Sequence, residues 1–202
     1  MKILHINTQD TGGAGKACLR LSTAINDLGF ISNLLVLRKT LKSKNIFKYK
    51  PTKKEVMLNF IMRIINKIKL SNLNIEKGET FSFINSGFKV EKTILYNESN
   101  IINLHWTASF LDYKTFFKDN NKKIIWTLHD MEPFSGGNHY TKIDKVSSTE
   151  KKILKNKLEI FKKNNINLTI VSPSKWLMNK SKESELFKDF PHFCIPNGID
   201  SN

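Results

Sequence analysis

The chain opens with a short apolar run that passes into small residues and then into a helical pattern. Residues 2–7 have the character of a short strand, and residues 8–15 form a loop rich in small side chains. Across residues 16–28, apolar side chains recur at spacings of three and four, which is typical of an amphipathic helix that Gly29 ends. Residues 30–37 are apolar again and predict a second strand. This order is a βαβ unit and predicts a parallel sheet, since such crossovers are almost always right-handed.

The same alternation continues to the end of the chain. Strands are expected at 101–104, 124–128, 168–171 and 193–195, an extended piece at 80–84, and helices at 55–70, 90–98, 111–118 and 148–163. A further helix is expected to open at Ser172-Pro173-Ser174, because Ser is a favourable N-cap and Pro suits the first helical turn. The sequence therefore predicts one α/β domain, a Rossmann-like parallel sheet flanked by helices, without internal repeats.

The net charge of +15 is concentrated in one segment. Between residues 38 and 69 there are eleven Lys or Arg residues and a single acidic residue, Glu55, so this segment supplies +10 of the total. A localised basic surface attracts polyanions or an anionic membrane. A solvated surface that only reflects compositional bias is the alternative.

The helix expected at residues 55–70 lies within this basic segment and is amphipathic. Its apolar stripe consists of Met57, Leu58, Ile61, Ile64, Ile65 and Ile68. Such a stripe either docks on the sheet or lies on a membrane surface. Peripheral contact with an anionic membrane through residues 38–70 is therefore one candidate interaction.

Length and composition restrict the class of protein to which the chain can belong. A chain of 202 residues with 40% apolar content can build a well-packed core. No run approaches the roughly 18–20 apolar residues of a membrane span, and the N-terminus becomes polar too early for a signal peptide, so a cytoplasmic protein is expected. Cys18 and Cys194 lie far apart in the sequence, with no second ligand near either, and we interpret both as small buried hydrophobes.

Polar residues gather where one apolar run ends. Residues 124–128 lead directly into His129 and Asp130, and open parallel sheets bind ligands at the carboxyl ends of their strands. Histidine suits hydrogen bonding or proton transfer near neutral pH, and Asp130 could orient it or bind hydroxyls. We take His129 and Asp130 as the catalytic candidates. A metal held by His129, Asp130 and His139 is disfavoured, because no helix fixes the glycine-containing loop between the histidines.

A second histidine follows the preceding apolar run. His105 and Trp106 come directly after residues 101–104. Because consecutive strands often neighbour each other, His105 and His129 could share one crevice. A structural histidine is the alternative for His105. Trp106 could stack on a sugar face or belong to the core.

A third candidate site is the glycine-rich stretch at residues 11–15. Glycines there bring backbone N–H groups close to an anion at the positive end of a helix, so phosphate is the expected ligand, and a tight turn is the alternative. A dinucleotide fingerprint is incomplete, because Cys18 stands where its third glycine belongs, although Arg38 would suit the 2′-phosphate of NADP. The P-loop pattern fails, because Asp10 and Ala17 occupy positions that it reserves for other residues.

Taken in order, five motifs resemble the N-terminal half of family-4 glycosyltransferases, which are retaining enzymes with the GT-B fold. The closest subset makes bacterial surface polysaccharides. The motifs span almost the whole chain: Met1-Lys-Ile-Leu-His-Ile-Asn-Thr with Thr11-Gly-Gly-Ala; Ile101-Ile-Asn-Leu-His-Trp; Trp126-Thr-Leu-His-Asp-Met-x-Pro-Phe-Ser-Gly-Gly; Val171-Ser-Pro-Ser-Lys-Trp-Leu; and Ile195-Pro-Asn-Gly-Ile-Asp.

The resemblance implies that residues 1–195 form a Rossmann-like acceptor-side domain. Such enzymes transfer a sugar from a nucleotide diphosphate-sugar to a glycan or lipid-linked hydroxyl acceptor, with no metal and no further cofactor. Gly12, Gly13 and Ala14 would approach the donor diphosphate through backbone amides. His129 would lie by the donor sugar. Asp130, His105 and Trp106 are implied more weakly, as acceptor-side or supporting groups.

The chain also departs from that family. Residues 196–202 correspond to the start of the hinge into a second, donor-binding domain that the sequence does not contain, so little activity is expected without a C-terminal partner chain. Thr141 follows where close relatives carry a cysteine-rich insertion, and Glu132 stands where they usually have Trp. The rival classes are a basic polyanion- or membrane-surface-binding protein, with no specific nucleic acid expected, and an NADP-dependent oxidoreductase.

Overall fold

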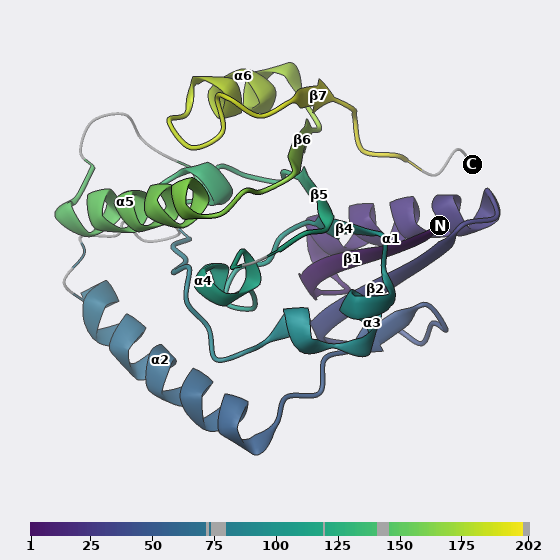
Figure 1. Cartoon of the computed structure of the whole chain (residues 1–202), viewed down its shortest axis with the longest axis horizontal. Helices are drawn as coiled ribbons and strands as arrows, with labels where there is room; N and C mark the ends of the chain where they lie inside the picture. Colours follow the sequence, from purple (N-terminus) through teal and green to yellow (C-terminus); the bar gives the residue numbers. More distant parts are fainter. Residues whose placement is uncertain (72, 74–79, 119, 141–145, 200–202) are drawn as a thin grey trace.

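The protein, described by a computed structural model, is an α/β domain built on one parallel sheet (Figure 1). The structure describes residues 1–71, 73, 80–118, 120–140 and 146–199. The sheet order is β3-β2-β1-β4-β5-β6-β7, and every neighbouring pair is parallel. The strands are β1 (Lys2–Gln9), β2 (Ile31–Arg38), β3 (Ile46–Lys48), β4 (Ile101–Leu104), β5 (Lys123–Thr127), β6 (Leu168–Ser172) and β7 (His192–Cys194). The predicted fold class is confirmed.

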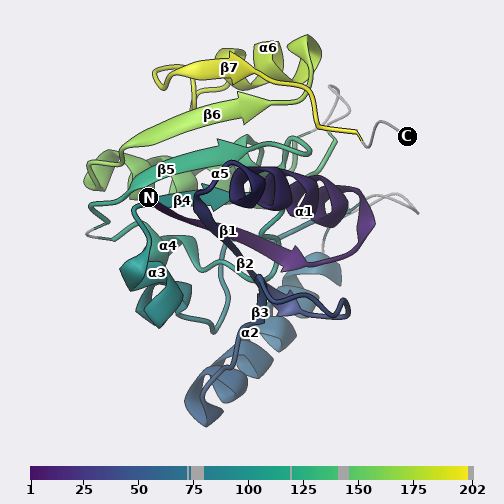
Figure 2. The same cartoon turned by 90° about the vertical axis from the view of Figure 1, so that its right-hand side faces the viewer.

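Helices cover both faces of the sheet, and most of them lie close to their predicted positions. They are α1 (Gly12–Asp27), α2 (Lys53–Ser71), α3 (Ile94–Glu98), α4 (Tyr113–Phe116), α5 (Ser148–Lys163) and α6 (Lys175–Glu183), with short 3₁₀ turns η1 (Val90–Lys92) and η2 (Glu132–Phe134). In Figure 2, α1 lies in front of the sheet, and α5 lies behind it. The helix α2 lies at the margin of the molecule in both views.

The two faces of the sheet bury different side chains, because successive residues of a strand point to opposite sides. Leu4 and Ile6 of β1 join the larger core cluster, which is rich in aromatic rings; its buried aromatic residues include Phe110, Phe116, Phe117, Trp126, Phe134, Phe161 and Phe187. On the other face, Cys18 of α1 packs in a smaller cluster with residues of β2 and β3. The interpretation of Cys18 as a buried residue is confirmed, whereas Cys194 is only half-buried and that part of the prediction is wrong.

Several boundaries differ from the sequence prediction for local reasons. The helix α1 begins at Gly12 rather than residue 16, because β1 continues to Gln9 and Gly12 turns the chain with a positive φ of 75°. The helix α4 is shorter than expected and starts after Asp112, whose side chain caps the Thr115 amide. The helix α6 starts after Ser174, so Pro173 precedes the cap. The strand β3 lies inside the basic segment, where no strand was predicted.

The extended piece at residues 80–84 and the C-terminal residues form little regular secondary structure among the described residues. Residue 81 of the extended piece forms only an isolated antiparallel bridge with Asn138. Residues 196–199 of the expected hinge have no regular secondary structure, and residues 200–202, like Thr141, lie outside the described residues. In the part of the chain that the structure describes, no helix combines the length and apolar character needed to cross a bilayer.

The close contact between α1 and the end of β1 gives a stability prediction. A Cβ at Gly15 would lie 2.7 Å from the Asp10 carbonyl carbon and 2.9 Å from the Gln9 oxygen, both backbone atoms that cannot move away cheaply. We expect Gly15→Ala to lower the free energy of unfolding by about 1–3 kcal/mol, measured by urea unfolding. Gly13→Ala is the matched control, since nothing lies within 4 Å of its added Cβ. Equal stability of the two variants would show that the contact does not constrain the helix.

Candidate functional site

The candidate site lies at the carboxyl ends of β1, β4 and β5, which are adjacent in the sheet. The chain moves from β1 to β2 and β3 on one side and returns to place β4 on the other side of β1. The point where the strand order reverses is where open α/β sheets bind their ligands. The first turn of α1 follows β1 here, and His105 and Trp106 follow β4. His129 follows β5, the next strand along.

Hydrogen bonds fix the loop after β1 against the loop after β4. The Thr8 amide donates to the Trp106 carbonyl at 2.8 Å, and the Trp106 amide donates to Asn7 Oδ1 at 2.8 Å. The Thr8 hydroxyl donates to the Ala108 carbonyl at 2.8 Å. The two loops that flank the switch point therefore form one rigid rim.

Three histidines form a hydrogen-bonded row beneath this rim. His5 Nδ1 lies 3.1 Å from His105 Nε2, and His105 Nδ1 lies 3.1 Å from His129 Nε2. His5 and His105 have exposed fractions of 0% and 2%, whereas His129 is half-buried. The His105 and His129 rings are stacked, with centroids 5.3 Å apart. The row runs from the core to the surface and brings the two predicted histidines together, with His5 as a third member that the sequence did not indicate.

Burial keeps all three rings neutral at physiological pH. Desolvation lowers the pKa of His5 from 6.5 to about 4. The pKa of His129 also falls to about 4 through desolvation, although Asp130 partly opposes the shift. His105 lies between two other imidazoles, and burial together with those neighbours lowers its pKa well below 6.5. Each ring therefore carries one N–H and one lone pair.

The orientation of the protons follows from the buried end of the row. His5 Nε2 is buried and has no hydrogen-bond partner among the described residues. A buried N–H without an acceptor is rarer and more costly than an acceptor without a donor, so Nε2 is the unprotonated nitrogen of His5. His5 then donates through Nδ1 to His105, and His105 donates through Nδ1 to His129. We infer that His129 carries its proton on Nδ1, the nitrogen left for a ligand.

Asp130 is turned into the protein and organises the loop after β5. Its Oδ2 accepts hydrogen bonds from the Trp106 indole at 3.0 Å and from His139 Nδ1 at 2.5 Å, and its Oδ1 accepts from the Glu132 amide at 3.0 Å. His139 Nε2 in turn lies 2.8 Å from the Ser82 hydroxyl. Hydrogen bonds, rather than a helix, therefore hold Asp130 and His139 in place within this loop. Asp130 positions its neighbours, and both of its oxygens are occupied.

Glu132 is also buried, and its partner is the only fully buried lysine among the described residues. Lys157 of α5 donates to Glu132 Oε1 at 3.0 Å and to the Glu132 carbonyl at 2.5 Å. Its amino group lies 5.3 Å from the centre of the Tyr113 ring. Burial lowers the pKa of Lys157, and Glu132 opposes this shift. The ion pair ties α5 to the loop that carries Asp130, which explains how the chain accommodates an acidic residue at position 132.

The first turn of α1 leaves its backbone N–H groups open. The N-cap residue, Thr11, makes no side-chain hydrogen bond to the helix, and the turn contains no acidic residue. Gly12 and Gly13 are exposed there, and Ala14 is half-buried. The glycines predicted as a loop therefore form the positive end of a helix, with donors free to meet an anion.

Asp10, which departs from the P-loop pattern, anchors the neighbouring loop after β2. Its carboxylate accepts from the Thr40 amide at 2.7 Å, the Leu41 amide at 2.8 Å and the Thr40 hydroxyl at 2.8 Å. Burial would raise the pKa of Asp10, but these hydrogen bonds outweigh it and hold the pKa below its ordinary value. An acidic residue directly after a strand, at the reversal of strand order, is the signal that could have identified it.

One group in the described part of the chain has the composition of a metal site. His5, Cys18 and His105 each offer a ligand atom, and the three atoms lie within 4.8 Å of one another. This corrects the expectation that Cys18 has no second ligand nearby. Burial raises the pKa of the Cys18 thiol well above its usual value, which favours the protonated form over a metal-binding thiolate.

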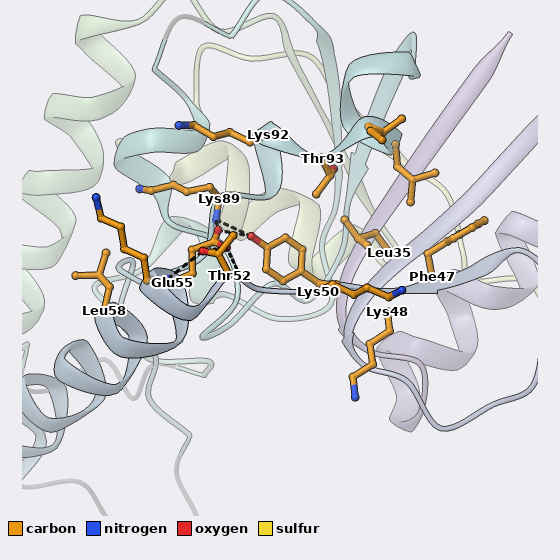
Figure 3. A pocket seen from close by; sticks show the side chains of 15 residues that line it. Leu35, Phe47, Lys48, Lys50, Thr52, Glu55, Leu58, Lys89, Lys92 and Thr93 are labelled. Atoms are coloured by element: carbon orange, nitrogen blue, oxygen red, sulfur yellow. Dashed lines mark hydrogen bonds between the residues drawn. The ribbon is translucent and has the colours of Figure 1, made fainter.

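The other sequence-predicted groups lie apart from the row. Arg38 ends β2 and is exposed at the neighbouring strand end. Trp106 is half-buried, with its indole N–H committed to Asp130. A cavity of about 710 Å³ lies elsewhere, between β3, the start of α2 and the η1–α3 segment (Figure 3), and none of the candidate site residues lines it.

Comparisons with known proteins assign no family to this chain, so a function can be proposed only from the geometry of the site. No family model, no curated protein and no solved structure matches this chain.

The neutral histidine row predicts a loss of stability in acid. An unfolded histidine takes up a proton near pH 6.5, whereas His5 and His129 resist protonation until about pH 4. The free energy of unfolding should therefore fall as the pH drops from 6.5 towards 4, by up to about 3 kcal/mol for each ring. Urea unfolding across this range should show a smaller loss in His5→Gln. The control His192→Gln, at a half-buried ring in β7, should keep most of it; equal slopes would contradict the assignment.

The buried ion pair gives a second prediction. Lys157→Met leaves Glu132 buried without its cation, so we expect the free energy of unfolding to fall by about 3–5 kcal/mol. The double variant Glu132→Leu with Lys157→Met removes both charges and should recover most of this loss. Thermal unfolding of the two variants is the measurement, and Lys155→Met, at an exposed position of α5, is the control. A double variant as unstable as the single one would contradict the pairing.

Proposed function

We propose that this chain is the acceptor-side half of a retaining glycosyltransferase. In this proposal, it helps to transfer a sugar from a nucleotide diphosphate-sugar to a hydroxyl group of a glycan or lipid-linked acceptor. The observation that carries it is the position of His129. Its free nitrogen ends a buried row of histidines at the carboxyl edge of the sheet, one strand away from the switch point beside the open turn of α1.

The open turn of α1 suits the diphosphate of such a donor. The backbone N–H groups of Gly12, Gly13 and Ala14 belong to the first turn, where the helix dipole favours an anion. The absence of a side chain on Gly13 lets a bulky phosphate approach the backbone, since nothing lies within 4 Å of its Cβ position. The diphosphate would therefore be held by main-chain donors rather than by charged side chains.

His129 would act as a hydrogen-bond donor to the sugar. With its proton on Nδ1 and a pKa of about 4, it is neutral at physiological pH and can hold a hydroxyl oxygen without giving up a proton. His105 and His5 keep this orientation from within the core. This half would then contribute to catalysis by orienting the donor sugar. A sugar that is already held in place loses less translational and rotational entropy on reaching the transition state, which lowers the activation barrier.

The other predicted residues take supporting roles. Burial withdraws His105 from direct contact with an acceptor, so it positions His129. Asp130 holds the Trp106 indole and His139, and thereby shapes the loop beside His129. The half-buried Trp106 remains the candidate for contact with an acceptor sugar. No metal or additional cofactor has a role in this proposal, in which a second domain binds the nucleotide.

The test is sugar transfer by the chain combined with a donor-binding domain of the resembling family. We expect His129→Ala to lower kcat by about 10²-fold or more, because it removes a hydrogen bond to the reacting sugar. His129→Asn, which keeps a donor, should recover part of the rate, and the rate of the wild-type chain should not follow a titration between pH 6 and 8. His192→Ala is the matched histidine control. Full activity of His129→Ala would contradict the proposed role.

A further inference from the structure

The helix α2 presents its apolar side chains to solvent. None of its residues is buried, and its most exposed large side chains include Phe60 at 62%, Ile68 at 61% and Met57 at 60%. The exposed apolar set continues along the whole helix: Val56, Met57, Phe60, Ile61, Ile64, Ile65, Ile68 and Leu70. A monomeric protein rarely exposes an apolar surface this continuous unless the surface binds something.

The orientation of α2 follows from the contacts on its opposite side. The residues that face the protein are partly buried and largely polar, and they recur at helical spacing: Glu55, Leu58, Asn59, Met62 and Asn66. Gly87 packs directly on this side, since a Cβ there would lie 2.3 Å from the Asn59 amide nitrogen. Of the predicted apolar stripe, only Leu58 faces the protein, so the alternative in which the stripe docks on the sheet is wrong for its other members.

The first turn of α2 is fastened by its single acidic residue. Glu55 Oε1 accepts from the Tyr49 hydroxyl at 2.5 Å and from the Lys89 amide at 2.9 Å, and Oε2 accepts from the Thr52 amide at 2.7 Å. These bonds hold the helix with its polar side inward. They also use the only carboxylate between residues 38 and 69, so the outward surface of this segment carries positive charge alone.

The exposed surface of α2 also carries positive charge. Lys53, Lys54, Arg63, Lys67 and Lys69 of α2 are all exposed. Further lysines stand around the 710 Å³ cavity at the first turn of α2, which Lys54, Glu55 and Leu58 line from the helix; Figure 3 shows Lys48, Lys50, Lys89 and Lys92 around it. A basic helix with large apolar side chains on one face lies in the plane of a membrane interface, with the apolar face inserted and the cations at the lipid headgroups.

We propose that α2 and the lysines beside it dock this protein peripherally on an anionic lipid bilayer. Charge decides between this occupant and a second copy of the chain. Two copies joined through α2 would bring two basic segments of +10 against each other, and the whole chain carries +15. An anionic bilayer pairs with the same charges while its hydrocarbon accepts the apolar side chains. This inference rests on α2 and stands independently of the proposed sugar transfer.

Co-sedimentation with vesicles of phosphatidylcholine and phosphatidylglycerol in equal parts tests the proposal. We expect the whole chain to bind these vesicles, to bind pure phosphatidylcholine vesicles far more weakly, and to lose most binding in high salt. Binding to the two kinds of vesicle with equal strength, or no binding to either, would overturn the proposal.

Two sets of variants separate the apolar and basic contributions. Phe60→Ser, Ile64→Ser and Ile68→Ser combined should weaken binding by about 100-fold or more, while Leu28→Ser, Phe193→Ser and Ile195→Ser, at exposed positions away from α2 and the cavity, should not. Lys53→Gln, Arg63→Gln and Lys67→Gln combined should weaken it by about 100-fold, whereas Lys151→Gln, Lys152→Gln and Lys155→Gln on α5 make the same charge change with little effect. Control sets that weaken binding equally would contradict a localised surface.

A direct probe keeps the test independent of how well the multiple variants fold. Phe60→Trp places an indole on the apolar face, and its emission should shift to shorter wavelength when anionic vesicles are added, relative to the unmodified chain. Analytical ultracentrifugation without lipid is the companion measurement. A dimer that the α2 serine variant converts to a monomer, together with no emission shift, would assign the surface to a second copy and overturn the proposal.

Discussion

The hydrogen-bonded row of His5, His105 and His129 is the constraint on which the site depends. Three imidazoles in contact inside a protein are stable only while all are neutral, since each positive charge would be both desolvated and repelled by the next. The row exists because the sheet places β1, β4 and β5 side by side. Because all three rings stay neutral, each has a single N–H. The hydrogen bonds of the row place the proton of His129 on Nδ1, the nitrogen that no other residue of the row contacts.

Buried polar groups around the row are arranged to support it rather than to react. Both carboxylate oxygens of Asp130 accept hydrogen bonds from neighbouring groups, and Glu132 forms an ion pair with Lys157 of α5. Such pairs add little net stability, but removing one partner is costly, so they fix the geometry of the loop after β5. What remains accessible at the strand ends is small: one imidazole nitrogen, one indole face and the open turn of α1. This set suits binding and orientation of a polar ligand better than proton transfer.

The sequence predicted the features that local patterns encode. Apolar runs located most strands, and the residues that follow them, His105 and His129, indeed meet at one edge. Patterns could not reveal partners that are distant in the chain, such as Lys157 for Glu132, or a histidine inside a strand, such as His5. The short strand β3 was missed because its residues lie among lysines. The amphipathic pattern of α2 was visible, but the side that faces the protein depends on Gly87 and on Glu55, which only the fold brings together.

The site as described requires His129 to be a neutral hydrogen-bond donor through Nδ1. Nitrogen-15 NMR of the histidine side chains reports the tautomer and the charge of each ring directly. We expect a protonated Nδ1 and an unprotonated Nε2 for His129 at neutral pH, with titration only near pH 4. A His129 ring that carries its proton on Nε2, or that is already cationic at pH 6, would contradict it.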